Sequence, residues 1–557
     1  MTTGNDYLAN TMAECGLTHF FNMPFILPNA IKSMQRVGVQ PIITHSEKAA
    51  AYMADGYARA SGKLGVCAAQ QIGAANLAAG LLDAYMGRSP VLAITGGSNA
   101  NMRDRNNYQE VDQQPVFAGL VKMHARVDAV GRLPDLLGQA MRVATTGAPG
   151  PVHLEFGEPA GALMDQEFAF APPVDARYAN APAIRHAAPA EDVKAAIAAL
   201  AKAKRPIIVA GSGIRSSGAT EALRRFYKKA NVPIATSLDA KSAPPEDDPL
   251  SVGVVGRYSR EIANQAVAEA DFVLFVGSTT GTMVTADFAC PKPGVDAVQI
   301  DVDPRELGRN YPLLVGLAGD SATILDQLTA ALGAPSDLGQ WLQWISDIRA
   351  DWRASVNGFE ISDAEPIRPE RLTKAVSDAL PDNALITVDT GHTAIWATRH
   401  LYLNGAKQSL LRCAGSLGWA YPAALGAKCA QPERPVICFS GDGAFLYHLT
   451  EMETAKRYGI NAITVINNNN AYSQEKPRWV ENNIYDHNWI FSPVSYAKVA
   501  EGFGHKAYVV EHARDIGAAM KDALKANAPA IIEVITDPLI SSPPPWRPGA
   551  PLIRARG

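Results

Sequence analysis

The sequence predicts an α/β protein that consists of three doubly wound domains, each built on a parallel β-sheet. The length of 557 residues exceeds what one hydrophobic core organises and indicates about three domains. Short β-branched runs alternate with helical stretches along the whole chain, which is typical of parallel sheets covered by helices on both faces. Two Pro- and Ala-rich stretches have the composition of linkers. They divide the chain into domains at 1–185, 190–335 and 365–545, followed by a C-terminal tail at 546–557.

The expected elements follow from these patterns in order. In the first domain, strands are expected at 40–45, 64–70 and 90–97, with helices at 49–61 and 76–87. In the middle domain, strands are expected at 205–213, 232–237, 271–277 and 297–303, with helices at 219–230 and 260–270. In the third, strands are expected at 384–389, 435–443, 461–468 and 529–536, with helices at 421–430 and 449–459. Ligands of such sheets bind beyond the carboxyl ends of the strands, so the residues just after each strand are the candidates for a site.

Composition excludes several classes of function. The net charge of −4 shows no bias toward nucleic acid or anionic membranes. The six cysteines are scattered, without CxxC or metal-ligand spacing, which indicates reduced thiols. The N-terminal segment lacks the pattern of a signal peptide, and no apolar run reaches the roughly 18 residues of a membrane span. We therefore expect a cytoplasmic protein with a small-molecule substrate and with no nucleic-acid or membrane partner.

The most informative stretch is "VICFSGDGAF", a strand followed by a turn around Asp442. Gly441 and Gly443 on either side allow close backbone approach and expose amides that suit a phosphate. A carboxylate beside such a cradle invites a hard cation such as Mg²⁺. The next expected strand ends in four asparagines, and Asn469 lies 27 residues further on (469 − 442). The alternative interpretation is a simple Asp turn with polar loop asparagines.

This strand–GDG–helix–strand–Asn-Asn order resembles the diphosphate- and magnesium-binding motif of thiamine-diphosphate-dependent enzymes. The layout of the whole chain is similar to the group of acetolactate synthase, pyruvate oxidase, pyruvate decarboxylase and oxalyl-CoA decarboxylase. That group orders a pyrimidine-binding, a central and a diphosphate-binding domain along the chain. The resemblance implies Asp442, Asn469 and the carbonyl of Ala471 as Mg²⁺ ligands, with Gly441 and the amides of Gly443 and Ala444 at the diphosphate.

Two further segments of the third domain match the family. "VDTGHTAIW" resembles its other diphosphate loop and implies Gly391, His392 and Thr393 at the cofactor, although His392 could instead cap a helix. "CAGSLGWAYPAALGAK" resembles the segment that holds the cofactor bent. Leu417 would be the apolar wedge between its two rings, and the carbonyl of Gly415 would accept from the aminopyrimidine. A leucine at this place could also be plain core.

Glu47 is the predicted catalytic residue. It follows a strand and begins an Ala-rich helix, where an acid is favoured by the helix dipole alone. The segment "THSEKAAAYMADGYARASGK" resembles the region with the glutamate that shares a proton with the cofactor's aminopyrimidine and so activates the thiazolium C2. One departure is Ser46, at a place often held by histidine.

The substrate side is less like the family. "QQIGAANL" matches a glycine-containing turn, with Gln71 in the substrate pocket and Asn76 at the cofactor, and "NYQEVDQ" implies Tyr108 and Gln109 in the pocket. A polar helix cap explains these residues as readily. Phe25 stands where the family has a glycine and is expected to fill the pocket, and Tyr472 is expected to begin its wall. Glu158 replaces a lysine common in acetolactate synthases.

FAD is doubtful as a further cofactor, because the segment "FVGSTTGTMVTADF" lacks the arginine that acetolactate synthases use there. The resemblance implies an enzyme dependent on thiamine diphosphate and Mg²⁺ that cleaves and forms C–C bonds of 2-keto acids. It also implies a homodimer or homotetramer with active sites at the dimer interface. The alternative is a 2-hydroxyacyl-CoA lyase or an oxalyl-CoA decarboxylase-like lyase with an acyl-CoA substrate. A dehydrogenase-like nucleotide binder lacks a GxGxxG turn with a downstream acid, and intact Glu47, Asp442 and Asn469 oppose a non-catalytic homologue.

Overall fold

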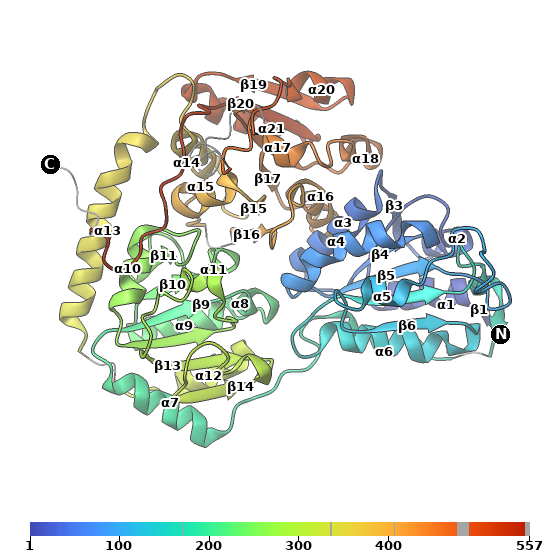
Figure 1. The fold of residues 1–557 in the computed structure, drawn as a ribbon, viewed down its shortest axis with the longest axis horizontal. Helices are drawn as coiled ribbons and strands as arrows, with labels where there is room; N and C mark the ends of the chain where they lie inside the picture. The colour runs from blue at the N-terminus through green and yellow to red at the C-terminus, as the bar shows by residue number, and fades with distance from the viewer. Residues whose placement is uncertain (170, 335–336, 406, 476–488, 552–557) are drawn as a thin grey trace.

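The computed structural model describes residues 1–551 except 170, 335–336, 406 and 476–488. The described residues form three six-stranded sheets, and every strand pair within them is parallel. Figure 1 shows one body in blue to cyan, one in green to yellow and one in orange to red, with helices around each sheet. The predicted fold class, three doubly wound α/β domains, is confirmed. The domain boundaries stay predictions.

The N-terminal sheet has its strands in the order β3 (Gln40–Ile43), β2 (His19–Asn22), β4 (Gly65–Ala69), β5 (Val91–Gly96), β7 (Val152–Phe156) and β6 (His124–Val127). A two-stranded antiparallel sheet of β1 (Thr2–Thr3) and β8 (Glu167–Phe168) lies beside it. Its helices are α1 (Gly4–Glu14), α2 (Pro28–Arg36), α3 (Glu47–Ser61), α4 (Ala74–Met86), α5 (Gln113–Phe117) and α6 (Leu133–Thr145).

The central sheet has the order β11 (Ser251–Val254), β10 (Ile234–Thr236), β9 (Pro206–Ala210), β12 (Phe272–Val276), β13 (Asp296–Asp301) and β14 (Val315–Ala318). Its helices are α7 (Ala190–Lys202), α8 (Gly213–Ser216), α9 (Thr220–Ala230), α10 (Glu261–Glu269), α11 (Thr282–Thr285) and α12 (Ser321–Ala331). The long helix α13 (Gly339–Glu360) then runs along the edge of this domain toward the C-terminal domain (Figure 1).

The C-terminal sheet has the order β16 (Ser409–Arg412), β15 (Leu385–Val388), β17 (Val436–Gly441), β18 (Ile463–Asn468), β20 (Ala530–Ile535) and β19 (Lys506–Val510). Its helices are α14 (Pro369–Ala379), α15 (His392–His400), α16 (Ala420–Ala430), α17 (Asp442–Phe445), α18 (Glu451–Tyr458), α20 (Tyr496–Gly502) and α21 (Ile516–Ala526). The chain leaves β15 in one direction and returns on its other side at β17. This reversal of strand order opens a crevice at the carboxyl ends of β15 and β17.

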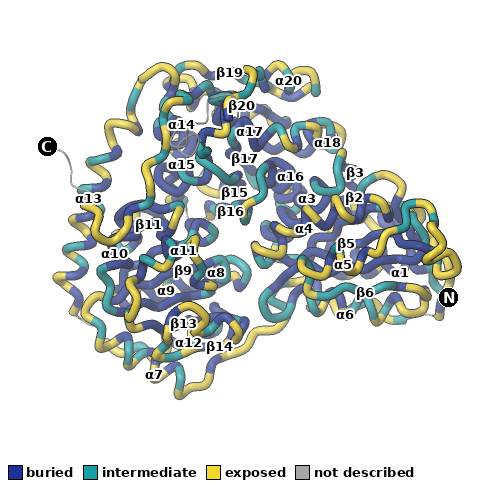
Figure 2. Tube along the Cα trace, in the orientation of Figure 1, coloured by how far each residue is buried: buried dark blue, intermediate teal, exposed yellow. Residues whose placement is uncertain are grey.

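Burial explains why these segments form these elements. The central strands β4, β9 and β12 are buried along their whole length, as their continuous apolar sequences require for a sheet covered on both faces. Figure 2 shows this buried interior in each domain and the exposed outer faces of α7 and α13. The sequence pattern therefore predicts the layers because each apolar strand has helices on both sides.

Helices α3 and α16 join the N- and C-terminal domains by a close contact. Ser46 caps α3 by accepting a hydrogen bond from the amide of Ala49, and Gly62 ends it in the left-handed region at φ 72°. A Cβ on Gly56 would lie 2.1 Å from the carbonyl oxygen of Ala423, so only glycine permits this helix spacing. The two domains consequently share one hydrophobic core.

The chain end is anchored to the central domain. Trp546 is buried in the central core, and its carbonyl accepts a hydrogen bond from Asn264 Nδ2 at 2.8 Å. Arg547 pairs with Asp287, whereas Arg554 and Arg556 lie outside the described residues. Within the described part of the chain, no helix combines the length and the apolar character that crossing a membrane requires.

Candidate active site

One cavity gathers every residue that the sequence predicts for the site in the C-terminal domain. It has a volume of about 510 Å³ and opens at the carboxyl ends of β15, β17 and β18, in the crevice where the strand order reverses. Four separate segments of the C-terminal domain meet there, at 390–393, 415–417, 441–447 and 467–475. The predicted residues that line it are Gly391, His392, Thr393, Gly415, Leu417, Gly441, Asp442, Gly443, Ala444, Asn469, Ala471 and Tyr472.

Asp442 lies buried at the bottom of this crevice, at the start of α17. Its carboxylate accepts hydrogen bonds from the amides of Gly443 at 2.7 Å and Asn469 at 3.0 Å. Burial raises the pKa of Asp442 to about 6, and the backbone amides oppose the rise. A bound cation would stabilise the charged form that burial disfavours.

The oxygen donors beside Asp442 suit a hard cation. The side-chain amide nitrogen of Asn469 donates to Ser473 Oγ at 2.8 Å, so its amide oxygen is the atom available to a metal ion. No group of three His, Cys, Asp or Glu side chains within the described ranges could hold a metal. A cation here would depend on one carboxylate plus amide and carbonyl oxygens, which fits Mg²⁺ rather than Zn²⁺.

Glycines shape the wall of the cavity where a diphosphate would lie. Gly391 adopts φ 78° before α15 begins at His392. A Cβ on Gly443 would lie 2.5 Å from the ring of Tyr472, and one on Gly441 would lie 3.0 Å from Thr393 Oγ1. The starts of two helices, α15 and α17, therefore line one space, and backbone amides at helix starts suit an anionic group.

The loop that carries Leu417 is held by two buried carboxylates that the sequence analysis missed. Asp83, on α4 of the N-terminal domain, accepts from the amides of Ala414 and Ser416. Asp389, directly after β15, accepts from the amides of Gly418 at 3.1 Å and Ala420 at 2.9 Å. Both acids are 1 % exposed. They fix the backbone on both sides of Leu417, which places this side chain in the cavity.

A buried ion-pair network supports Asp83. Arg59 of α3 forms two hydrogen bonds with Asp55, at 2.8 and 2.7 Å, and its Nη2 lies 3.7 Å from Asp83 Oδ1. Asp55 also accepts from Trp419 Nε1 at 2.8 Å. Burial raises the pKa of Asp83, and the Arg59 cation counteracts this rise. The N-terminal domain thus positions a loop of the C-terminal domain through charged hydrogen bonds.

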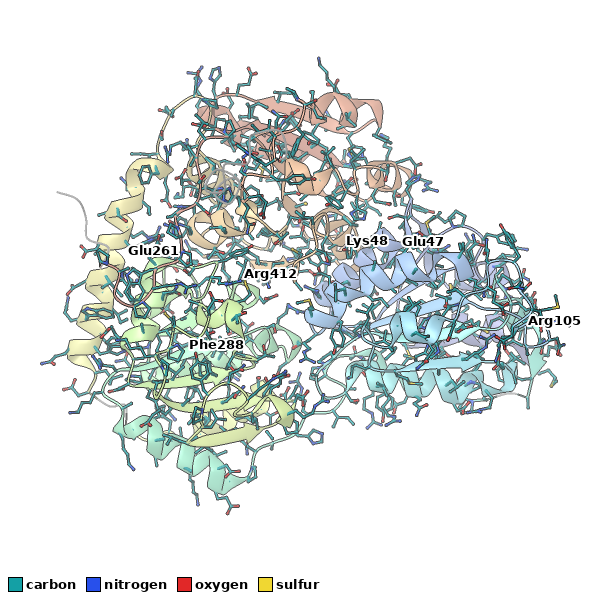
Figure 3. All side chains as sticks on the ribbon, in the orientation of Figure 1. Glu47, Lys48, Arg105, Glu261, Phe288 and Arg412 are labelled. Atoms are coloured by element: carbon teal, nitrogen blue, oxygen red, sulfur yellow. The ribbon has the colours of Figure 1, made fainter. Side chains whose placement is uncertain are left out.

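Glu47 lies at the carboxyl edge of the N-terminal sheet, at the first position of α3 (Figure 3). Asn76 Nδ2 donates to its Oε2 at 3.3 Å. A Cβ on Gly73 would lie 2.6 Å from Glu47 Oε1, so glycine at this turn makes room for the carboxylate. The structure therefore brings together Glu47 and Asn76.

The other predicted residues of the first domain surround the same sheet edge. Gln71 follows β4 and is buried, with Nε2 donating to Ser98 Oγ at 2.9 Å. Phe25 is 71 % exposed and adopts φ 66°, and Tyr108 is 79 % exposed beside Gln109 at φ 64°. These two aromatic side chains lie on loops with strained backbone conformations, and both are exposed on this face of the single chain.

Within one chain, Glu47 does not line the C-terminal cavity. Its neighbour Lys48 does approach the rim, where Nζ lies 5.8 Å from the ring centre of Tyr447. The N-terminal candidates and the C-terminal candidates thus form two separate groups in the single chain.

The segment "FVGSTTGTMVTADF" (275–288), in which the arginine of a flavin site is absent, lines a second cavity of about 280 Å³ in the central domain. Ser278, Thr279 and Thr282 contribute to it, together with Arg412 of the C-terminal domain. Arg412 pairs with Asp239 at 3.0 Å (labelled in Figure 3). The doubt about FAD stays a prediction.

Family models match each of the three domains. The model described as the thiamine pyrophosphate enzyme N-terminal TPP binding domain matches residues 2–116. The central domain model matches 193–328, and the C-terminal TPP binding domain model matches 389–534. These matches define the class as a thiamine pyrophosphate (thiamine diphosphate) enzyme.

Whole-chain relatives are acetolactate synthase large subunits. A probable one from Methanocaldococcus jannaschii is 32% identical over 519 residues, which covers 90% of this chain and 86% of the relative. Isozyme 1 of Escherichia coli K12 is 28% identical over 556 residues, covering 98% and 96%. The Lactococcus lactis protein is 27% identical over 546 residues, covering 96% and 92%. The chain belongs to the thiamine-diphosphate-dependent enzymes, in their acetolactate synthase group.

Proposed function

We propose that the protein is an acetolactate synthase-like decarboxylase and carboligase that acts on 2-keto acids with thiamine diphosphate and Mg²⁺. The observation that carries the proposal is the C-terminal cavity, where an Asp carboxylate with an Asn amide oxygen, the starts of helices α15 and α17, and an apolar residue on a fixed loop lie together. The acetolactate synthase large subunits named above support the choice of carboligation. When bound, the cofactor supplies a carbon nucleophile and an electron sink for the cleavage of a C–C bond.

In this proposal, the C-terminal domain binds the cofactor. Asp442, Asn469 and the carbonyl of Ala471 hold Mg²⁺, and the amides of Gly443 and Ala444 hold the diphosphate together with Gly441. The second loop, Gly391 to Thr393, completes the diphosphate site. Leu417 would support the bound cofactor from the cavity wall, and the carbonyl of Gly415 would accept a hydrogen bond from its aminopyrimidine.

Glu47 is proposed to hold and move the proton at the aminopyrimidine ring. The carboxylate rests against Asn76 Nδ2 and the space left by Gly73, which fixes its direction. General acid–base catalysis by a positioned carboxyl group typically contributes about 10²- to 10⁴-fold to a rate. Leu417, which is half-buried on its fixed loop, supplies apolar surface that helps to exclude water from this proton transfer.

A homodimer or homotetramer is proposed to complete the site. Glu47 and the cofactor cavity form separate groups within one chain. The exposed Phe25 and Tyr108 lie on the uncovered face of the N-terminal domain. In a symmetric dimer, that face of one chain would cover the C-terminal cavity of the other, so that each active site uses both chains.

A second candidate function is that of a 2-hydroxyacyl-CoA lyase or an oxalyl-CoA decarboxylase-like lyase. The observations that favour it are the departures on the substrate side. Phe25 occupies a glycine place at φ 66°, and Glu158 occupies a lysine place at φ 73°. Both residues adopt the left-handed backbone conformation, which residues other than glycine and asparagine rarely adopt.

A donor screen decides between these activities. The purified protein is saturated with thiamine diphosphate and Mg²⁺ and supplied with pyruvate, longer 2-keto acids, oxalyl-CoA or 2-hydroxyacyl-CoAs. The proposal predicts release of CO₂ and a new C–C bond from a 2-keto acid donor. Turnover of an acyl-CoA alone would establish the alternative instead.

A further inference from the structure

A cluster of arginines surrounds a cavity that shares no lining residue with the cofactor cavity, where α13 packs on the central domain. The cavity has a volume of about 230 Å³. Glu261, labelled in Figure 3, marks this junction of α10 and α13. The residues that line the cavity are Glu246, Ser251, Arg260, Ile262, Arg349, Ala350, Trp352 and Arg353.

Arg260 is the buried floor of this arginine cavity. It is 3 % exposed and stacks on the ring of Trp352, with its guanidinium carbon 4.4 Å from the ring centre. Its Nη1 donates to Glu246 Oε2 at 2.7 Å, whereas its Nε has no acceptor within the described part of the chain. A buried guanidinium nitrogen without an acceptor is costly, and an anion in the cavity would supply one.

The carboxylates nearby are already used by other groups. Glu246 pairs with Lys241 through one oxygen and with Arg260 through the other. Asp248 accepts from Tyr227 OH at 2.7 Å and from the amide of Leu250 at 3.0 Å. Two further acids are also bonded: Glu360 accepts from His400 and Tyr402, and Glu261 pairs with Arg399.

Arg349 and Arg353 therefore carry charge that no carboxylate among the described residues pairs with. Among the described residues, Arg349 donates to the backbone carbonyl of Asp248 alone, and the guanidinium carbon of Arg353 lies 4.0 Å from the ring centre of Tyr402. Burial lowers the pKa of Arg349, and the cations Arg260 and Arg353 lower it further, whereas the anions Asp248 and Glu246 oppose the fall. Because these neighbouring cations repel one another, an anion bound in the arginine cavity would stabilise them.

We propose that the arginine cavity binds a phosphoryl group, either inorganic phosphate or the phosphate end of a small metabolite. Two unpaired guanidinium groups match the charge of a dianion, and charge-assisted bonds from arginine to phosphate are among the strongest in proteins. Ser251 offers a hydroxyl donor on the same wall. The donors come from α13, from the segment before α10 and from β11, and so surround a tetrahedral group rather than one flat carboxylate.

The position of the arginine cavity connects it to the cofactor-binding helix. Arg260 Nη2 donates to the carbonyl of Arg399 and Lys241 Nζ to that of Thr398, both at 3.3 Å. These carbonyls lie at the last turn of α15, whose first turn carries His392 and Thr393 in the cofactor cavity. The cations also interact favourably with the negative end of this helix. An anion held by the same arginines would therefore contact the network that supports α15.

Isothermal titration calorimetry on the holoenzyme tests the site. Bound thiamine diphosphate and Mg²⁺ keep phosphate out of the cofactor cavity, and desalting removes free cofactor. Inorganic phosphate, glycerol 3-phosphate, succinate and chloride are titrated at constant ionic strength. We expect saturable binding of phosphate or of the phosphate ester; tighter binding of the ester identifies a metabolite as the source, and equal or weaker binding identifies free phosphate.

Variants locate the binding. Arg349→Gln should weaken phosphate binding by about tenfold or more, and Arg225→Gln, on the exposed surface of the central domain, should not change it. Arg353→Gln alters an exposed side chain and serves as a second variant where Arg349→Gln fails to fold. The proposal is overturned by the absence of saturable binding, by equal binding in the two cavity variants and the wild type, or by succinate binding more tightly than phosphate.

Discussion

The carboxylate of Asp83 should control how firmly the cofactor is held, although it belongs to the N-terminal domain. Its two oxygens accept from the amides of Ala414 and Ser416, on the loop that places Leu417. In Asp83→Asn, the side-chain oxygen can keep one of these bonds, but the new NH₂ group faces the other amide. One charged hydrogen bond becomes a contact between two donors, and Arg59 loses a neighbouring anion.

The cost follows from these contacts. A buried hydrogen bond to a charged group contributes about 1.5–3 kcal/mol, and an unsatisfied buried donor adds about 1–3 kcal/mol. We therefore expect a loss of roughly 2–4 kcal/mol in the free energy of unfolding. Looser placement of Leu417 that costs about 1.4 kcal/mol of the binding free energy raises the Kd for thiamine diphosphate about tenfold.

Isothermal titration calorimetry of the apoprotein with thiamine diphosphate and Mg²⁺ measures this Kd, and kcat is measured at saturating cofactor. A merely structural role would leave kcat unchanged, whereas a misplaced wedge lowers it. Asp83→Glu, which keeps the charge, should restore part of both values. Asp135→Asn changes an exposed acid of the same domain and is the control. Wild-type affinity and kcat in Asp83→Asn would refute the positioning role.

Three further outcomes are expected. Asp442→Ala should abolish retention of the cofactor, measured by thiochrome fluorescence of the purified protein, whereas the exposed-acid control Asp378→Ala should retain it; retention by both variants would contradict the proposed metal site. Because burial raises the pKa of Asp442 to about 6 and Mg²⁺ needs the ionised carboxylate, Mg²⁺ affinity should be level above pH 6 and fall by about tenfold per pH unit below it, as calorimetry at several pH values would show; an affinity unchanged between pH 5 and 7 would exclude this carboxylate as a ligand. Phe25→Gly should admit bulkier donors, and it should keep or raise stability by up to about 1 kcal/mol because φ 66° suits glycine; an unchanged donor profile would remove Phe25 from the substrate wall.

The residues predicted for the C-terminal half of the candidate site line one cavity, and the signals that predict them are local. A strand, a turn and the next strand fix where Asp442 and Asn469 lie, since parallel strands end at the same edge of a sheet. The alternation of apolar strands and helices likewise predicted the three sheets, because each strand is covered on both faces.

Other parts of the candidate site could not be predicted from the sequence, because they depend on contacts between distant segments. Asp83 and Ala414 are 331 positions apart, and no pattern around "LLDAYMG" indicates that this acid faces a loop of another domain. The role of Asp389 has a weak local signal, because this acid stands two residues before Gly391 in the predicted diphosphate loop. The arginine cavity has the same origin, since Arg260 and Arg349 meet only when α13 packs on the central domain.

Mixing two inactive variants tests the central claim most directly. Glu47→Gln and Asp442→Ala should each lack turnover of a 2-keto acid, the first while still binding Mg²⁺. If each active site combines Glu47 of one chain with Asp442 of another, a hybrid dimer contains one intact site. Co-expression of the two variants with random pairing should then restore about one quarter of the wild-type activity. No recovery in a mixture shown to contain hybrid dimers, or near-normal activity of Glu47→Gln alone, would contradict the account.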